Sequence, residues 1–261
     1  MRLITDVPVP VPGAGEVLIR VTAAGVNFAD ISKAHGTFRD GPRPPYLAGF
    51  EAAGEIVAVG EAVTGLQPGA RVVGVGNGAF AEYMVLLAAA TVPVPPGWTE
   101  QQALGLVVNW PTALAALKLL GGVTAGQTVL IHAAAGATGQ AAVTMAKHYG
   151  ATVIATASPG KHATVLALGA DHVLDSLGGE ASITNWVLVY KHQVHVIGFN
   201  IGVLIQAAPK IFGEVMGELS ALVAAGVLSP GRPTACDLAD GPKTLAELEA
   251  RSTVGKLALL P

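Results

Sequence analysis

Residues 128–139 combine a short apolar run with a glycine turn at the start of a helical pattern, and no other segment constrains the fold as strongly. Thr128 to Ala133 has the composition of a buried strand, and a helical pattern follows it. Gly136 and Gly139 stand at the second and third glycine positions of a GxGxxG turn, with Ala134 at the first. A helix that begins at such a turn directs its first N–H groups at a phosphate. The segment therefore predicts a dinucleotide-binding turn.

Strand and helix patterns alternate after this turn, which predicts a doubly wound parallel sheet with helices on both faces. The expected elements are a helix at Thr138–Tyr149, a strand at Thr152–Ala157, a helix at Lys161–Leu168 and a strand at His172–Leu174. A further strand at Val194–Phe199 and a long helix at Gln206–Ala225 follow them. The whole pattern is typical of the α/β class.

The first 90 residues have a different pattern, rich in valine, glycine and short apolar runs, which predicts a small β-rich domain. Its expected strands are 16–21, 54–60, 71–74 and 79–85. A proline cluster at 93–96 ends this domain. Beyond it, Thr99 and Gln102 form a capping box, and Pro111–Leu120 is a second expected helix.

The C-terminal segment predicts a short helix at Leu245–Arg251 and a strand at Lys256–Leu260. We assign it to the first domain. The expected domains are therefore residues 1–96 with 228–261, and residues 97–227.

The composition narrows the functional classes. Hydrophobic residues make up 51% of the chain and charged residues 13%, which indicates a large buried core. A net charge of −3 offers no basic face for nucleic acid. No apolar run reaches the length of about 20 residues that spans a bilayer, and no signal-type segment follows Met1. These features predict a cytoplasmic protein that acts on small molecules, without a membrane or nucleic-acid partner.

Possible metal ligands are scattered. Cys236 is the only cysteine, so a four-cysteine zinc site is excluded. None of the seven histidines forms an HExxH pair. The sequence therefore predicts no metal site.

The second strand of the alternating pattern bears on the choice of cofactor. An acidic residue about 20 residues after the glycine turn would favour NAD. Here Ser158 and Lys161 follow the strand instead, and they offer a hydroxyl group and a cation to a 2′-phosphate. NADP is the expected cofactor. The alternative is that Lys161 is a solvated residue in the first turn of a helix.

Four motifs together resemble one family: Ala23–Asp30, Gly49–Gly54, Asn109–Ala113 and His132–Gly136. The chain is similar to the medium-chain dehydrogenase/reductase superfamily, in its zinc-free quinone oxidoreductase (zeta-crystallin-like) branch. The resemblance implies a GroES-like catalytic domain and a Rossmann domain. Zinc-using relatives carry a cysteine where Asn27 stands and a histidine where Phe50 stands, so it also implies a site without metal.

The resemblance implies roles for particular residues. Asn27, Asn109 and Thr112 would line the nicotinamide end of the site, together with Phe199 and Asn200. The turn residues Ala135, Gly136, Ala137, Thr138 and Gly139 would bind the cofactor, and Arg251 or Lys256 would approach its phosphate or lie solvated at the surface. Asp30 and Tyr46 are candidate proton donors. The alternatives are that solvent protonates the product and that such residues serve as turn or cap residues.

The expected activity is NADPH-dependent reduction of a quinone or another conjugated enone, in a homodimer that pairs through the edge strand Val194–Phe199. Two alternatives stay open. One is a nucleotide-binding protein without turnover. The other is an enoyl reductase that acts on acyl thioesters.

The sequence departs from the family pattern after Ser176, where two strand–helix units of about 30 residues each are expected but absent before Ile183. Either residues are missing from this sequence between 176 and 183, or the chain is deleted there. We favour the first, because a true deletion would expose apolar faces of the sheet. Ser176 also stands where such relatives often carry a tyrosine.

Overall fold

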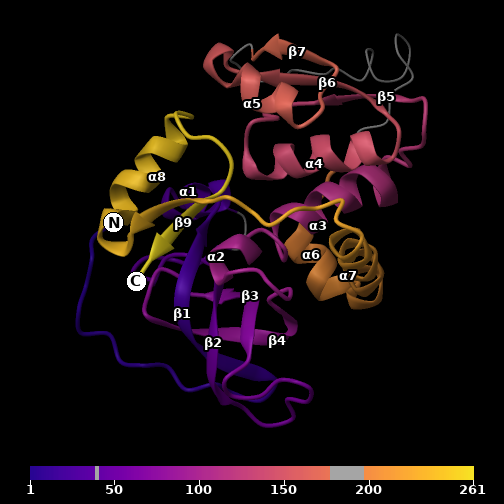
Figure 1. Ribbon diagram of the computed structural model, residues 1–261. Helices are drawn as coiled ribbons and strands as arrows, with labels where there is room; N and C mark the ends of the chain where they lie inside the picture. The colour runs from indigo at the N-terminus through magenta and orange to yellow at the C-terminus, as the bar shows by residue number, and fades with distance from the viewer. Residues whose placement is uncertain (39–40, 177–196) are drawn as a thin grey trace. The chain divides into compact units, whose positions relative to one another are not determined.

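A computed structural model describes residues 1–38, 41–176 and 197–261 (Figure 1). The chain divides into two compact units. Unit 1 comprises Met1–Pro111, Gly136–Thr138 and Leu228–Pro261, and unit 2 comprises Thr112–Ala135 and Gly139–Val227. The functional domain boundaries expected from the sequence stay a prediction.

Unit 1 is built on a six-stranded sheet of order β2-β3-β4-β1-β9-β8, in which β1 also pairs with β2. The neighbouring strands are antiparallel except for the parallel pair β8 and β9. The strands are β1 (Glu16–Val26), β2 (Glu51–Val59), β3 (Arg71–Asn77), β4 (Tyr83–Pro93), β8 (Thr234–Asp237) and β9 (Leu257–Leu260).

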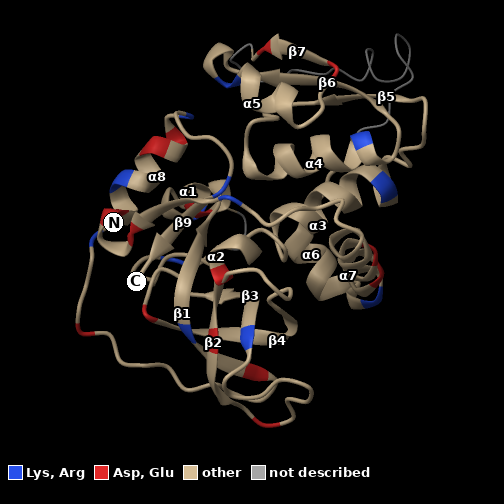
Figure 2. Ribbon diagram, in the orientation of Figure 1, with Lys and Arg blue, Asp and Glu red and all other residues tan. Residues whose placement is uncertain are grey.

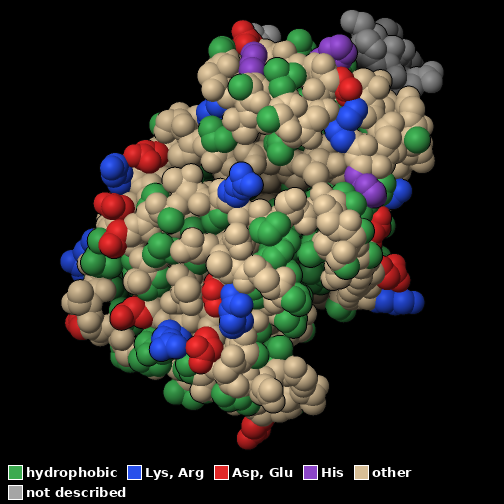
Figure 3. Space-filling view, viewed as in Figure 1, with side chains coloured by type: hydrophobic (Ala, Val, Ile, Leu, Met, Phe, Trp, Pro, Cys, Tyr) green, Lys and Arg blue, Asp and Glu red, His purple; other side chains and the backbone are tan. Residues whose placement is uncertain are grey.

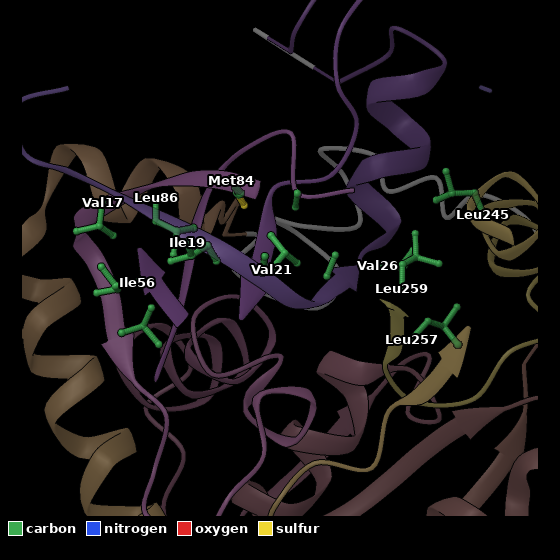
Figure 4. Packing of buried hydrophobic residues seen from close by; sticks show 14 of the residues in the cluster. Val17, Ile19, Val21, Val26, Ile56, Met84, Leu86, Leu245, Leu257 and Leu259 are labelled. Atoms are coloured by element: carbon green, nitrogen blue, oxygen red, sulfur yellow. The ribbon is translucent and has the colours of Figure 1, made fainter. Parts of the chain in front are cut away.

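Alternating apolar side chains of these strands form the core of unit 1. Figure 4 shows Val17, Ile19 and Val21 of β1 together with Leu257 and Leu259 of β9 in one cluster. Because β9 pairs with β1 along Ala24–Val26, the C-terminal segment completes the sheet that the first 90 residues begin.

The helices of unit 1 are short. They are α1 (Phe28–Ala34), α2 (Glu100–Ala103) and α8 (Gly241–Glu249), with a 3₁₀ turn at Leu238–Asp240. The capping box of Thr99 and Gln102 is confirmed at the start of α2. α3 (Asn109–Leu114) begins in unit 1 and continues into a π-helix at Ala115–Leu120 that ends at Gly121.

Unit 2 contains a parallel sheet of order β5-β6-β7, so the predicted α/β alternation is confirmed. The strands are β5 (Thr128–Ile131), β6 (Thr152–Ala157) and β7 (His172–Asp175). The helices between them are α4 (Ala137–His148), whose first two residues belong to unit 1, and α5 (His162–Ala167), which follows a 3₁₀ turn at Pro159–Lys161. α6 (Ile201–Ala207) and α7 (Pro209–Ala224) also belong to this unit.

Two expectations differ from the structure, and a third falls on residues that it does not describe. Residues 197–199 form no strand, so the described part of Val194–Phe199 offers no edge for the expected homodimer. The expected helix Gln206–Ala225 is two helices, because Pro209 lacks the N–H that a continuous helix would require. The question of missing residues between 176 and 183 lies outside the described residues.

The charged side chains are scattered along the described chain (Figure 2), and on the face shown in Figure 3 they alternate with apolar ones. In the described ranges, no helix is long and apolar enough to span a membrane. The same ranges contain no group of three or more histidine, cysteine, aspartate or glutamate residues that could hold a metal ion.

Candidate functional site

A buried polar cluster lies where several elements of unit 1 begin or end. Asn27 follows β1, Glu51 begins β2, Asn109 begins α3, and Lys256 precedes β9. Glu51, Asn27 and Asn109 are all buried, and the side chain of Lys256 is 9% exposed. The cluster therefore joins segments that are more than 200 residues apart in the sequence.

Both carboxylate oxygens of Glu51 accept hydrogen bonds. The backbone N–H of Gly105 donates to Oε1 at 2.5 Å. Asn27 Nδ2 donates to Oε2 at 2.9 Å, and Lys256 Nζ donates to the same oxygen at 2.5 Å. A buried charge is strongly destabilising unless it is paired and hydrogen-bonded, and this arrangement provides both.

Lys256 also fixes the orientation of two amide groups. Its Nζ donates to Asn27 Oδ1 at 2.8 Å and to Asn109 Oδ1 at 2.9 Å, so its three N–H bonds all have acceptors. Asn109 Nδ2 in turn donates to Asn27 Oδ1 at 3.2 Å and to Thr138 Oγ1 at 3.1 Å. The cluster thereby contacts the first turn of α4.

Gly25 makes this close approach possible. A Cβ atom at this position would lie 2.5 Å from Glu51 Oε2 and 2.9 Å from Lys256 Cε. Only glycine leaves space there for the carboxylate and the lysine stem, so the segment Ala23–Asp30 has a steric reason for its glycine.

Asp30 lies in the first turn of α1, next to the cluster. Its Oδ2 accepts from the backbone N–H of Asn27 at 2.8 Å, whereas its Oδ1 has no hydrogen-bond partner among the described residues. Burial raises the pKa of Asp30 from 3.8 to about 7, although the Asn27 hydrogen bond and the charge of Lys33 act in the opposite direction. Asp30 can therefore hold a proton near neutral pH.

The glycine turn of unit 2 is tightly packed. A Cβ atom on Gly139 would lie 2.4 Å from the carbonyl oxygen of Ala133 and 2.7 Å from the Cα of Ala134. The backbone N–H of Ala134 donates to the carbonyl oxygen of Thr156 at 3.0 Å, which fixes the turn to the end of β6. Ala133 has a φ of 51°, in the left-handed region. This packing is what a dinucleotide turn requires of its third glycine.

The end of β6 carries the residues expected to select the cofactor. Ala157 ends the strand, Ser158 is exposed, and Lys161 lies in the 3₁₀ turn that precedes α5. No carboxylate occurs between residues 157 and 161. The position that would hold an acid in an NAD site therefore offers a hydroxyl group and an ammonium group.

The other expected site residues lie outside the buried cluster. Thr112 is half-buried in α3, Phe199 is half-buried in a loop, and Tyr46 lines a small pocket of unit 1. Asn200 accepts a hydrogen bond from Gly202 N at 2.8 Å and caps α6. Arg251 is exposed after α8, with a φ of 56°. Their roles toward a cofactor or substrate stay predictions.

The turn residues 135–139 are divided between the two units. Ala135 and Gly139 belong to unit 2, and Gly136, Ala137 and Thr138 belong to unit 1. Within unit 1, Gly136 forms a parallel bridge with Gly255, the residue before Lys256. The turn and the buried cluster are thus connected through neighbouring residues.

Lys256 is the main residue whose place the sequence did not reveal. The solvated surface role considered for it is wrong, because its side chain is 9% exposed and pairs with Glu51. Its role near a cofactor phosphate stays a prediction. A lysine just before an apolar terminal strand was the only signal, and nothing in the sequence identified its partner.

The chain is similar to parts of several known proteins. Residues 13–96 match the alcohol dehydrogenase GroES-like domain family. Erythronolide synthase EryA2 of Saccharopolyspora erythraea is 35% identical over 94% of this chain, and prostaglandin reductase-3 of Bos taurus is 41% identical over 65% of it. The chain spans only 8% of the first protein and 45% of the second.

Solved structures resemble the chain over nearly its full length. Mycobacterial Rv1454c, solved in complex with NADPH, is 27% identical with a TM-score of 0.91, and the match covers 98% of this chain and 95% of that one. The CurK enoyl reductase is 26% identical with a TM-score of 0.87, and the quinone oxidoreductase of Pseudomonas syringae is 27% identical with a TM-score of 0.86. Each of these two matches covers 98% of this chain and 94% of the other.

Proposed function

Because the chain belongs to the medium-chain dehydrogenase/reductase superfamily, in its zinc-free quinone-oxidoreductase-like branch, we propose that it is an NADPH-dependent reductase of quinones or other conjugated enones. The observation that carries the proposal is the glycine turn, where a Cβ atom on Gly139 would collide with the backbone of Ala133. NADPH supplies a hydride when it is bound.

The chain's own residues fit NADP. The turn residues 135–139 would hold the pyrophosphate with backbone N–H groups at the start of α4. Ser158 and Lys161 would hold the 2′-phosphate, and no nearby carboxylate would repel it. The solved complex of the related Rv1454c with NADPH supports this assignment.

The buried cluster supports chemistry without a Lewis acid. Asn27 and Phe50 stand where zinc-using relatives carry metal ligands, and neither an amide nor a phenyl ring is a zinc ligand of the usual kind. Lys256 instead places a cation beside Asn27 and Asn109. Hydride addition to a conjugated system suits such a site, because the negative charge spreads onto a distant oxygen atom.

The side chains around the cluster have distinct proposed roles. Asn109 and Thr112 would orient the nicotinamide, together with Phe199 and Asn200. Asn27 is held rigidly by Glu51 and Lys256 and would form one wall of the site. Asp30 and Tyr46 are the proton donors first considered, and burial raises the pKa of Asp30 to about 7.

A second candidate substrate class is an enoyl thioester. It is favoured by the match of erythronolide synthase EryA2 over 94% of this chain, and by the likeness to the CurK enoyl reductase. The conjugated C=C–C=O group is common to enones and enoyl thioesters, so the same hydride addition serves both. What differs is the group that the protein must bind beyond the carbonyl.

The test compares three acceptors with the purified chain: 1,4-benzoquinone, 2-cyclohexenone and the N-acetylcysteamine thioester of crotonic acid. We expect NADPH absorbance to fall with at least one of them, and NADH to react at least about tenfold more slowly. The charge-reversing variant Lys161→Glu should remove that preference, since a charge-assisted hydrogen bond contributes about 1.5–3 kcal/mol. Binding of NADPH without oxidation by any acceptor would instead identify a nucleotide-binding protein without turnover.

A further inference from the structure

A small pocket in unit 1 lies beside α1, and its lining residue Gly49 stands two residues before Glu51 of the buried cluster. Its volume is about 230 Å³, below the range of roughly 300–1,000 Å³ that accommodates drug-sized ligands. The lining residues are Lys33, Pro42, Tyr46, Leu47, Gly49, Asn77 and Gly78. A pocket of this size fits one small functional group or ring.

Lys33 gives this pocket a cation that is only partly solvated. Its side chain is half-buried, and its Nζ lies 4.0 Å from the ring centroid of Phe50 and 5.4 Å from that of Phe38. Aromatic faces hold an ammonium group without using its N–H bonds. Among the described residues, no carboxylate lies within ion-pair distance of Nζ and no hydrogen bond from it occurs. The rings therefore hold the ammonium group in place, and its N–H bonds can be donated to a bound ligand.

Burial and the charged and titratable groups around Lys33 set the pKa of its ammonium group. Burial lowers the pKa of Lys33, and the charge of Asp30 on the same helix opposes this effect. Burial and the charge of Asp30 raise the pKa of Tyr46, so its phenol keeps its proton. Where α8 packs on α1, His35 and Glu249 pair with each other at 2.8 Å. Asp30 itself binds a proton near neutral pH and then no longer balances the Lys33 charge.

We propose that Lys33 is the catalytic proton donor of this pocket and that Tyr46 donates a hydrogen bond to the same substrate carbonyl group. This inference rests on the proposed reductase function. The ligand that it assigns to the pocket is an α,β-unsaturated carbonyl compound or a quinone. Lys33 takes the donor role in place of Asp30, which is not among the lining residues of the pocket, and Tyr46 keeps a hydrogen-bonding role in the same wall.

The step balances in atoms and electrons. The hydride of NADPH forms a C–H bond at the β-carbon, NADP⁺ is released, and the π electrons of the double bond move to give an enolate. The Nζ–H bond of Lys33 then breaks, its proton forms a bond to the α-carbon or to a quinone oxygen, and the electron pair stays on nitrogen. Lys33 recovers its proton from water, so the net reaction consumes one NADPH and one proton per substrate.

Three variants test the proposal. Lys33→Met keeps the apolar stem over the Phe50 ring and removes the N–H donors. Lys33→Arg keeps the charge and the ring contact, but a guanidinium group does not release a proton. Lys243→Met is the control, because Lys243 lies exposed on α8 and pairs with Glu247 on the same helix. Thermal unfolding of each variant verifies its folding.

We expect Lys33→Met and Lys33→Arg to lower kcat by roughly a hundredfold or more, the usual contribution of a general acid, with unchanged NADPH affinity. In the wild-type protein kcat should fall at alkaline pH as Lys33 loses its proton, below the ordinary lysine pKa of about 10.4. Neither variant should show that fall. If Lys33→Met keeps kcat within about threefold of wild type, or Lys33→Arg keeps the wild-type rate and pH profile, the proposal is wrong.

A measurement without turnover separates this proposal from the proposed function. 4-Nitrophenolate mimics an enolate oxygen, and its absorbance changes when it binds next to a cation. We expect the wild-type protein and Lys243→Met to bind it, and Lys33→Met to bind it at least about tenfold more weakly. If no acceptor oxidises NADPH but this difference is found, the reductase function fails while Lys33 is supported as the donor of an oxyanion site. Equal binding by all three proteins overturns the assignment of Lys33.

Discussion

Glu51 and Lys256 form a buried ion pair. Whether this pair stabilises unit 1 depends on the hydrogen bonds that its remaining polar atoms make. The two charges are almost fully buried, so their desolvation opposes folding, and their mutual attraction offsets this only with good geometry. Gly105, Asn27 and Asn109 supply the remaining bonds. Removing one charge leaves the other buried without its partner.

Replacing Lys256 with methionine should therefore destabilise the protein by about 3–5 kcal/mol, the usual cost of breaking a buried pair. The double variant Glu51→Gln, Lys256→Met should be more stable than Lys256→Met alone, because it contains no unpaired buried charge. Urea unfolding followed by circular dichroism measures both differences. The exposed Lys243→Met should change stability by less than about 0.5 kcal/mol, and an equally small change for Lys256→Met would refute the argument.

Single residues were predictable where a local motif contained them. The resemblance placed Asn27 and Asn109 at the nicotinamide end and Thr138 in the cofactor turn, and the structure joins the three by hydrogen bonds, while their roles toward a cofactor stay predictions. The sequence predicted neither the pairing of Lys256 with Glu51 nor the place of Lys33 in a pocket wall. The first is defined by a contact across 205 residues, and the second by the ring of Phe50 and by a pocket wall, neither of which a sequence motif encodes.

At the scale of elements, the turn between β5 and α4 is limited by one close packing contact. Gly139→Ala places a methyl group 2.4 Å from the carbonyl oxygen of Ala133, so the helix must move away from the turn. Overpacking of this kind costs about 1–3 kcal/mol. We expect the dissociation constant for NADPH, measured by calorimetry, to rise about tenfold or more.

Gly217→Ala in α7 is the matched control for this prediction, because its Cβ would meet no atom within 4 Å. Alanine is the better helix former, so this variant should keep its NADPH affinity and gain slightly in stability. Unchanged NADPH binding by Gly139→Ala would show that the turn does not carry the cofactor.

Helices and strands with a clear hydrophobic pattern were predictable from the sequence, and those with a weak pattern were not. The strand Thr152–Ala157 was predicted with the bounds of β6, because its apolar run is bounded by a glycine and a proline. β8 was missed, since Thr-Ala-Cys-Asp has little apolar content and becomes a strand only by pairing with β9. The start of α8 was placed too late, because Gly241 and Pro242 suggest a turn rather than a helix.

At the scale of the whole molecule, the free energy of unfolding reflects every group that binds protons differently in the folded and unfolded states. Asp30 is such a group, with a pKa of about 7 when folded and an ordinary value of 3.8. Between about pH 4 and pH 7 the folded protein holds this proton and the unfolded chain does not. Its contribution to stability is therefore complete below about pH 4 and is lost as the pH rises through about 7.

We expect the stability of the wild-type protein, relative to Asp30→Asn, to fall by up to about 1.4 kcal/mol per pH unit across that window. Asparagine keeps an oxygen acceptor for the backbone N–H of Asn27 and does not titrate. Urea unfolding of both proteins at several pH values from 4 to 8 gives the difference. A difference that does not vary with pH would mean that Asp30 titrates alike in the folded and unfolded chain.

The presence of a β-rich part and an α/β part was predictable from the change of pattern after the proline cluster. The domain boundaries, with residues 228–261 in the first domain, stay a prediction. The compactness of unit 1 was not predictable, because it depends on pairing between β1 and β9, which lie at opposite ends of the sequence. Sequence periodicity identifies each strand but does not show which other strand it pairs with.

The pairing of β9 with β1 has a consequence for biosynthesis. Lys256 leaves the ribosome 205 residues after Glu51, an interval of roughly 10–40 seconds at about 5–20 residues per second. During that time Glu51 lacks its cation, and the Ala24–Val26 edge of β1 lacks the strand that covers it. The nascent chain thus carries an incomplete sheet until its last strand is translated, and this exposed edge is a surface that cellular chaperones can recognise.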